Sequence, residues 1–425
     1  MIIGKITRKI EFPLYIIFIL QLFFSKEICF LISSLYLFLQ IITHKKLYLP
    51  KLGGLLIFVI FIIYGSILGI ISCSIREIFR DYIYILPSFI WLFIGFYKCR
   101  KDEKSYDKLI NTLIIYGITV SIKCIFDLVC NFTMNFDDLR KIFNVCISDV
   151  SMIAGVVLYC KIAMKKIFFG KNFDWILLGG MLIQILLSFG RISILEFFII
   201  VFGAFVFKIL IQGKNKKAIK GFIKVFCITI IVIMIIFTII PEDVTYRFML
   251  KLAKSFEEIN TTVAISSVKD AMNNWRSYEM QQAFNQWNEG GIGYKILGNG
   301  IGSGVQIEYV PYTWTDIAAN NQIPILHNGF YTILFKGGIV GLFSLLMIFF
   351  STIVIGYKLL KYTVLKDMGA IMISISISCI ACTYVVRGIV EKGGFLAWGI
   401  FVGSFLGVIS LKNKKKEILD EKSLK

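Results

Sequence analysis

The chain has 425 residues, 57% of them hydrophobic and 17% charged, and it carries a formal net charge of +19. The apolar residues come in blocks of roughly 20 with few charges inside them, which is the length that crosses the hydrocarbon core of a bilayer. This pattern excludes a soluble globular protein, and no signal-peptide cleavage site follows the first block. The sequence therefore predicts an all-α, polytopic membrane protein.

Twelve membrane spans are expected. With the N-terminus in the cytoplasm, the short segments on that side hold most of the 46 lysine and arginine residues. The positive-inside rule then places both termini in the cytoplasm. The basic charge reflects this topology and attraction to anionic membrane lipids, so no nucleic-acid partner is expected. In chain order, the spans lie at about 11–24, 28–43, 54–73, 82–98, 109–130, 150–164, 174–190, 192–212, 221–240, 337–357, 367–386 and 393–411.

The ten cysteines have neither the pattern of a disulfide framework nor that of a metal site. Most lie within expected spans, where cysteine acts as a small apolar residue. Cys130 and Cys146 flank one outer loop, and two free thiols are favoured there over a bridge. No cluster of cysteine and histidine has metal-ligand spacing, so no metal ion and no other cofactor is expected.

The longest connection between spans is a large external loop, far longer than an ordinary loop. It divides the chain into residues 1–240 with spans one to nine, the loop itself at 241–328, and residues 329–425 with spans ten to twelve and a basic cytoplasmic tail. The loop contains helical patterns at 245–260 and 267–287, a Gly-rich turn at 297–304 and an aromatic-rich segment at 309–316.

Ionisable side chains near membrane depth are costly and mark a pair, a site or a pathway. Lys123 and Asp127 lie four residues apart on one span and are expected to neutralise each other. Arg387 and Glu391 have the same spacing, and a structural pair and a functional role are equally open there. Arg191 lies in the outer turn "LLSFGRISILEF" with no carboxylate four residues away. Its guanidinium can contact lipid headgroups or an anionic ligand. The ligand is favoured, because a planar guanidinium can hold phosphate oxygens bidentately.

Arg276 and His327 belong to the external loop. A loop arginine is most often a solvated charge, and His327 in "IPILHNGFYTILFKGG" is by itself more often a hydrogen-bonded interface residue than a catalyst. An imidazole nevertheless titrates near neutrality, so this residue is also able to take or orient a hydroxyl proton.

In their order along the chain, these features resemble the O-antigen ligase and O-antigen polymerase superfamily of bacterial membrane glycosyltransferases. The resemblance rests on about twelve spans, the arginine turn, and the series "NWRSYEMQQAF", "LGNGIGSG" and "HNGFYTILFKGGIVGLF" late in the chain. It implies a GT-C-like helical fold and metal-free transfer of a glycan from an undecaprenyl diphosphate donor to an acceptor hydroxyl. The implied place is the outer face of the bacterial cytoplasmic membrane, with the large loop periplasmic or extracellular.

The resemblance also implies roles for single residues. Arg191 and Arg276 match the arginines that hold the diphosphate, and His327 matches the histidine beside the reacting hydroxyl. Fixed guanidinium groups stabilise the negative charge that grows on a diphosphate leaving group. Further substrate-binding candidates are Asn328, Arg387, Lys336, which is equally able to snorkel, and Tyr312 and Trp314, whose side chains more often anchor a protein at the membrane interface.

Two functions within the superfamily and one outside it remain open. A polymerase joins lipid-linked repeat units into O-antigen or capsular polysaccharide, with a chain-length regulator as a candidate partner. A ligase transfers the glycan to lipid A–core instead, and the weak overall likeness favours the polymerase. A transporter or flippase is the rival of another class; the sequence has no paired halves, and its large loop is placed asymmetrically.

Overall fold

The computed structural model describes residues 9–102, 104–131, 135–212, 242–253, 265–310, 321–363 and 365–423, together with scattered residues between 219 and 238. Over this part of the chain the fold is almost wholly α-helical. Its strands there are one short antiparallel pair, β1 (Val305–Gln306) and β2 (Gln322–Ile323). The predicted all-α class is therefore confirmed.

Seven helices in the described part of the chain are long and apolar enough to cross a membrane, and each overlaps an expected span. Large apolar side chains stay exposed on their outer faces, as lipid-facing surfaces require. The seven are α3 (Lys26–Thr43), α4 (Leu55–Ser72), α7 (Lys104–Asn131), α11 (Arg191–Gln212), α18 (Gly329–Leu360), α19 (Lys366–Val386) and α20 (Leu396–Ser423).

Two further candidate spans are bent pairs of helices, which begin before the spans expected at about 82–98 and 150–164. α5 (Ile75–Ile85) meets α6 (Pro87–Lys101) at 49°, and α8 (Phe136–Phe143) meets α9 (Ile147–Ala163) at 68°. The first bend falls at Pro87, because proline starts a helix well but cannot continue one. The second falls at Cys146, whose φ of 47° is not helical.

The described residues therefore give seven spans, or nine when each bent pair counts as one, against the twelve expected. α2 (Phe12–Phe23) and α10 (Phe173–Leu187) are apolar and match two expected spans, but they are shorter. The span expected at 221–240 lies largely outside the described residues. The chain is a multi-pass membrane protein by the length and composition of its helices.

Two helices of the bundle, α6 and α20, pack so closely that their backbones are in contact. α20 packs along α6, and a Cβ atom at Gly403 would lie 1.9 Å from the carbonyl oxygen of Leu92. One turn earlier, a Cβ atom at Gly399 would lie 2.5 Å from the oxygen of Ser88. Small residues at four-residue spacing let membrane helices approach this closely. Both helices belong to one large apolar core.

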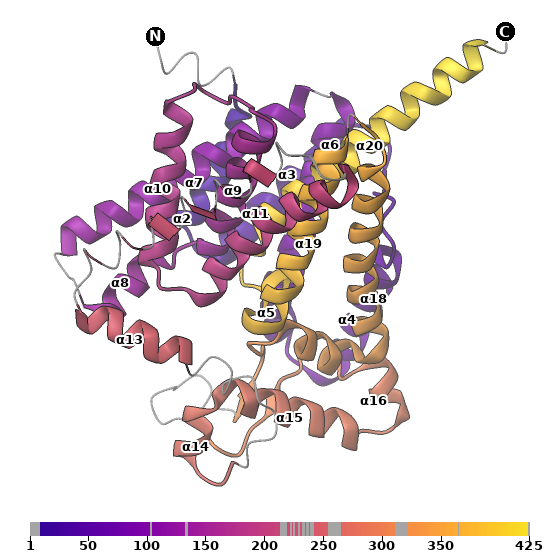
Figure 1. Cartoon of the computed structure of the whole chain (residues 1–425). Helices are drawn as coiled ribbons and strands as arrows, with labels where there is room; N and C mark the ends of the chain where they lie inside the picture. The colour runs from indigo at the N-terminus through magenta and orange to yellow at the C-terminus, as the bar shows by residue number, and fades with distance from the viewer. Residues whose placement is uncertain are drawn as a thin grey trace.

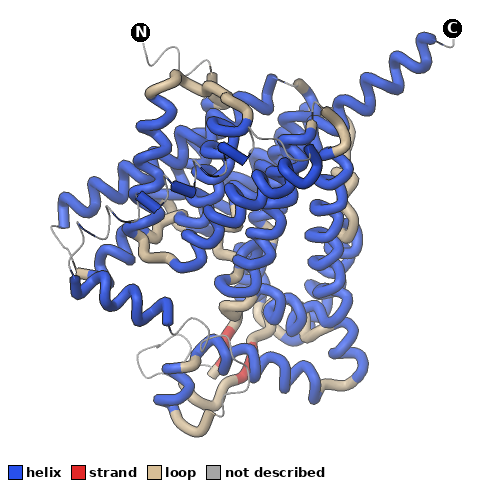
Figure 2. The backbone as a smooth tube through the Cα atoms, in the orientation of Figure 1, coloured by secondary structure: helices blue, strands red, loops and turns tan. Residues whose placement is uncertain are grey.

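A layer of short helices covers one end of this bundle and is here called the end layer (Figures 1 and 2). It comprises β1, β2 and the helices α14 (Val268–Asn273), α15 (Trp275–Glu289) and α16 (Ile292–Leu297). The sequence predicted one helix over 267–287, but Asn274 breaks it with φ −120° and ψ 34°. The pattern at 245–260 is described only as far as α13 (Glu242–Ala253). The end of α20 lies at the opposite end of the molecule (Figure 1).

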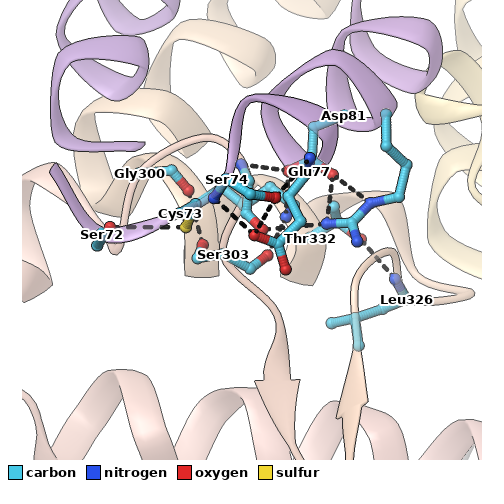
Figure 3. A network of polar contacts seen from close by, with 12 residues as sticks. Ser72, Cys73, Ser74, Glu77, Asp81, Gly300, Ser303, Leu326 and Thr332 are labelled. Atoms are coloured by element: carbon cyan, nitrogen blue, oxygen red, sulfur yellow. Dashed lines mark hydrogen bonds and ion pairs between the residues drawn. The ribbon is translucent and has the colours of Figure 1, made fainter. Parts of the chain in front are cut away.

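The Gly-rich turn fastens the end layer to the bundle (Figure 3). The backbone N–H of Ile301 donates to the oxygen of Gly65 in α4 (2.8 Å), and that of Gly302 donates to the Asp81 carboxylate in α5 (2.6 Å). Ser74 and Glu77 form a capping box at the start of α5, which orients the helix that presents Asp81. The turn's three left-handed positions, with φ of 76°, 89° and 102°, are all occupied by glycine: Gly298, Gly300 and Gly302.

Candidate functional site

A cavity of about 780 Å³ lies where the end layer meets the bundle. Its wall combines the ends of several bundle helices with one side chain from α15 and with the segment just before α18. Four residues that the sequence singled out line it, although they are distant along the chain: Arg191, Arg276, His327 and Arg387.

The turn from α10 into α11 places Arg191 on the cavity wall. Phe189 takes a left-handed φ of 46°, and the hydroxyl of Ser188 accepts the N–H of Gly190 (3.1 Å). α11 then begins at Arg191 itself. The N-terminus of a helix is the positive end of its dipole. The helix start therefore adds to the positive potential of the guanidinium, and this end of the cavity attracts anions.

His327 is held by a carboxylate that the sequence did not single out. Glu279 of α15 is 2% exposed, and its oxygens lie 2.9 and 3.0 Å from Nδ1 of His327. The same carboxylate accepts the backbone N–H of His327 at 2.8 Å. A carboxylate only accepts hydrogen bonds, so Nδ1 carries the proton in this pair. The other ring nitrogen, Nε2, is then left as a proton acceptor on a ring that lines the cavity.

Glu279 and Arg276 are presented by one helix. They lie three residues apart on α15, which brings them to the same side of the helix. Asn274, whose backbone breaks the helix, starts this turn, and the N–H of Tyr278 donates to its carbonyl oxygen at 2.9 Å. This spacing from Arg276 is the sequence signal that could have pointed to Glu279.

Arg387 is positioned by the end of α19 and not by Glu391. α19 ends at Val386, and Arg387 takes a left-handed φ of 78°. Its Nε donates to the carbonyl oxygen of Leu326, next to His327, at 3.1 Å. The ion pair with Glu391 that the four-residue spacing allowed does not form among the described residues, because the helix that it requires has already ended.

Among the described residues that line the cavity, basic side chains outnumber acidic ones. The acids of this described lining are Asp149, which accepts the N–H of Ala397 at 2.8 Å, and Glu391. Glu391 faces solvent on the cavity side. Partial desolvation by the surrounding protein raises the pKa of its carboxyl above the ordinary value, and the positive charges of Arg387, Lys26 and His327 partly offset this rise. Six basic side chains oppose these two acids: Lys26, Arg140, Arg191, Arg276, Arg387 and Lys392.

Lys336 is not part of the cavity. Its side chain is 1% exposed, and Nζ lies 2.6 Å from the fully buried Asp81, with the carbonyl oxygen of Ser303 as a second partner. Arg80 also donates to Asp81 at 3.0 Å (Figure 3 shows this network around Asp81). Lys336 is therefore not available as a diphosphate ligand, because its ammonium is buried against Asp81. Its ion pair instead helps to hold the Gly-rich turn against α5.

Asn328 also lies away from the cavity lining. Its side chain is 3% exposed and caps α18, accepting the N–H groups of Phe330 (3.0 Å) and Tyr331 (3.2 Å). It thus orients the turn that carries His327 and does not itself face a ligand. The predicted pair of Lys123 and Asp127 forms, with Nζ 2.6 Å from Oδ2, and Cys130 and Cys146 are free thiols.

The aromatic candidates Tyr312 and Trp314 lie outside the described residues. Within the described ranges, no group of three or more His, Cys, Asp or Glu side chains is arranged to hold a metal ion. The chemistry of the cavity, as far as the chain is described, lies in its guanidinium, ammonium, imidazole and carboxylate groups.

Comparison of the chain with protein-family models, with curated proteins and with solved structures finds no match in any of the three.

Proposed function

We propose that the protein is a membrane glycosyltransferase that polymerises oligosaccharide repeat units linked to undecaprenyl diphosphate. One observation carries the proposal: Arg191, Arg276 and His327, from three distant segments, line the same cavity. A cationic cavity beside a carboxylate-held imidazole suits a reaction that needs both a base and stabilisation of an anionic leaving group.

The first step of the proposed reaction is activation of the acceptor. An acceptor sugar hydroxyl gives its proton to Nε2 of His327 as its oxygen attacks the anomeric carbon of the donor glycan. Glu279 keeps the proton on Nδ1 and stabilises the imidazolium that forms. A buried carboxylate that also holds the backbone of His327 leaves the ring little freedom to turn.

The second part is departure of the donor's lipid diphosphate. The bond between the anomeric carbon and the phosphate oxygen breaks, and negative charge collects on the diphosphate. Arg191, Arg276 and Arg387 supply guanidinium groups that were in place before the reaction, so the charge meets fixed partners. Their planar forks hold phosphate oxygens bidentately. This role takes the place of a divalent cation, and the proposed reaction is metal-independent.

The topology that goes with this function has twelve spans in a GT-C-like bundle. α2, α10 and the segment at 221–240 would add three spans to the nine candidate spans. The proposed location is the bacterial cytoplasmic membrane with both termini in the cytoplasm and the end layer outside. This arrangement places the cavity where lipid-linked repeat units emerge.

The experiment that tests the function uses lipid-linked repeat units extracted from cells that lack this gene, because such cells should accumulate them. The purified protein in detergent is expected to convert them to longer glycans and release undecaprenyl diphosphate, and EDTA should leave the rate unchanged. Transport of the lipid-linked sugar across liposomes without any longer glycan would instead establish a transporter.

The acceptor separates polymerase from ligase. We expect chain growth on lipid-linked repeat units and no transfer to lipid A–core. Transfer to lipid A–core alone would show a ligase with the same cavity and the same chemistry. A His327→Ala variant should bind undecaprenyl diphosphate as the parent protein does while losing turnover, which controls for contaminating transferases.

A further inference from the structure

We propose that α16 binds the membrane surface, with its apolar side chains inserted between the lipids of the leaflet on the cavity side. The end layer is then partly embedded, and the bilayer holds it as well as the bundle does. The inference concerns the outer surface of the protein and not its cavity, so it goes beyond the proposed function and does not depend on it.

The side chains of α16 are turned away from the protein. In this helix, whose six residues all belong to the described part of the chain, none is buried. Four large apolar or aromatic side chains are between 39% and 78% exposed: Ile292, Tyr294, Ile296 and Leu297. Water solvates such a cluster poorly, and an exposed apolar patch marks a contact with a partner or with a membrane.

The backbone of α16 packs against α18. A Cβ atom at Gly338 of α18 would lie 2.3 Å from the carbonyl oxygen of Ile296. A Cβ atom at Gly298, which follows α16, would lie 2.4 Å from the nitrogen of Gly338. Glycine at both positions lets the two backbones meet, and the exposed side chains of α16 lie on the outside of the bundle. Figure 1 shows α16 directly below α18.

The exposed face of α18 continues the same apolar surface. Ile339, Phe343, Leu346 and Phe350 are between 47% and 60% exposed, and their three- and four-residue spacing puts them on one side of the helix. Because α18 is a candidate span, this stripe faces lipid. The stripe starts at Ile339, directly after the Gly338 on which α16 is docked. The lipid-facing surface therefore passes from the span to α16.

Helix lengths place α16 at the edge of the hydrocarbon core. From Ile339 to Leu360, α18 measures about 33 Å, which is enough to cross a core of about 30 Å. The neighbouring α4 gives the same level. The Gly-rich turn that follows α16 docks at Gly65, and the exposed Ile67 and Ile71 continue along α4 beyond this point. α16 therefore lies near the lipid headgroups, where apolar helix faces insert into a leaflet.

The polar groups of α16 suit this depth as well. Tyr294 and Lys295 are of the types that lie at a membrane interface, with an apolar body and a polar tip. The indole nitrogen of Trp287 donates to the carbonyl oxygen of Lys295 at 3.1 Å, and its ring contacts the exposed Phe284. The sequence of α16 has no acidic residue that anionic headgroups would repel. These side chains, together with the continuous stripe, favour lipid over a protein partner.

Fluorescence quenching in liposomes tests the insertion. The exposed Cys130 and Cys227 are changed to serine, and Ile292→Cys is labelled with an environment-sensitive NBD group. The labelled protein is reconstituted in phosphatidylcholine and phosphatidylglycerol with a nitroxide either near the headgroup or near the end of the acyl chain. The headgroup-side nitroxide should quench this label at least ~2-fold more than the other, because an interfacial helix lies at shallow depth.

Two further labelled variants serve as controls. Phe350→Cys, in the middle of the α18 stripe, should be quenched best by the deep nitroxide, and Lys269→Cys, exposed on α14, by neither. Quenching of Ile292→Cys as weak as that of Lys269→Cys would show a water-exposed α16 and overturn the inference. A blue-shifted but unquenched label on Ile292→Cys, with a crosslink between two copies there, would show that a second chain covers α16 and would overturn it as well.

Discussion

At the scale of single residues, the chemistry assigned to His327 depends on Glu279. The carboxylate faces Nδ1 at 2.9 Å and is itself 2% exposed, so water does not replace it. A buried charge-assisted hydrogen bond of this kind holds one tautomer and one ring orientation. Without it, Nδ1 and Nε2 would compete for the proton and the base would be present only part of the time.

Replacing Glu279 with glutamine should show whether Glu279 sets the tautomer and orientation of His327 or only fills space in the fold. The amide has nearly the same shape, but its NH₂ group can donate to Nδ1 and so favour the proton on Nε2. We expect turnover to fall on the order of 10²- to 10⁴-fold with a changed pH–rate profile. The thermal unfolding midpoint should move little. A variant with the parent pH profile would show that Glu279 supports the fold and not the imidazole.

Arginine at positions 191 and 276 should not be exchangeable for lysine. An ammonium keeps the charge but loses the planar fork. Arg276→Ala should lower turnover about 10²-fold, the usual cost of removing one donor to a developing anion, and Arg276→Lys should recover only part of it. Full activity of Arg276→Ala would remove this residue from the site. The exposed Lys269→Gln, on the neighbouring α14, serves as the control.

The residues of the site differ in how far the sequence could reveal them. Arg191, Arg276 and His327 stood out because each is a charged or titratable group next to apolar sequence or within a recognisable series. Glu279 lies among polar residues of α15, where its three-residue spacing from Arg276 is the one local feature that separates it from the exposed Glu289. Its role arises when α15 packs beside the segment before α18, 48 residues further along.

At the scale of elements, the position of α18 depends on a buried ion pair and on a backbone break. The helix runs from Gly329 to Leu360, but Gly338 interrupts it with φ 60°. A Cβ atom there would lie 2.3 Å from the oxygen of Ile296 in α16. Lys336, just before the break, reaches Asp81 of α5. The first turns of α18 are therefore joined to the end layer and to α5.

Removing Lys336 should destabilise the protein and not merely weaken substrate binding. Lys336→Ala leaves Asp81 buried with only Arg80 and a backbone N–H, at a cost of about 3 kcal/mol. The paired variant Asp81→Leu/Lys336→Met should recover most of the loss, because no charge remains buried. Thermal unfolding in detergent measures both. An unchanged midpoint in Lys336→Ala, together with weaker diphosphate binding, would restore Lys336 as a ligand.

The elements that the sequence predicted well are those set by composition alone. Runs of apolar residues as long as the bilayer is thick become helices whatever packs against them. The bends were harder to predict: Pro87 is a recognisable signal, whereas a cysteine gives no sign of the left-handed φ that Cys146 adopts. Gly399 and Gly403 at four-residue spacing also signal a close helix contact, but the sequence does not say that α6 is the partner.

At the scale of the whole molecule, the two ends of the bundle differ: the cavity and the end layer lie at one end, and the end of α20 lies at the other (Figure 1). α3 shows it within one helix, since Lys26 at its start lines the cavity and Thr43 ends it near the other end of the bundle. At that second end, two residues of α6 contact segments near the two ends of the described chain: Lys98 pairs with Glu11 (3.1 Å), and Arg100 donates to Ser410 (2.6 Å). The proposed function requires the cavity end to be outside the cell.

Cysteine labelling tests this orientation. In a background where the exposed Cys130 and Cys227 are serine, Lys269→Cys in the end layer should react with a membrane-impermeant maleimide in intact cells. Lys46→Cys, beyond the other end of α3, should react only after the cells are opened. The reverse pattern would place the cavity in the cytoplasm and contradict the proposed function.

The docking of the Gly-rich turn also bears on biosynthesis. The turn binds α4 at Gly65, ~10 Å before that helix ends. α4 and α5 leave the ribosome long before this turn and α18 are translated, so Asp81 must wait for its lysine. A nascent chain stalled before residue 329 lacks both the Lys336–Asp81 ion pair and the part of the cavity lining that contains Arg387. The complete lining of the cavity therefore exists only after synthesis has passed Phe395.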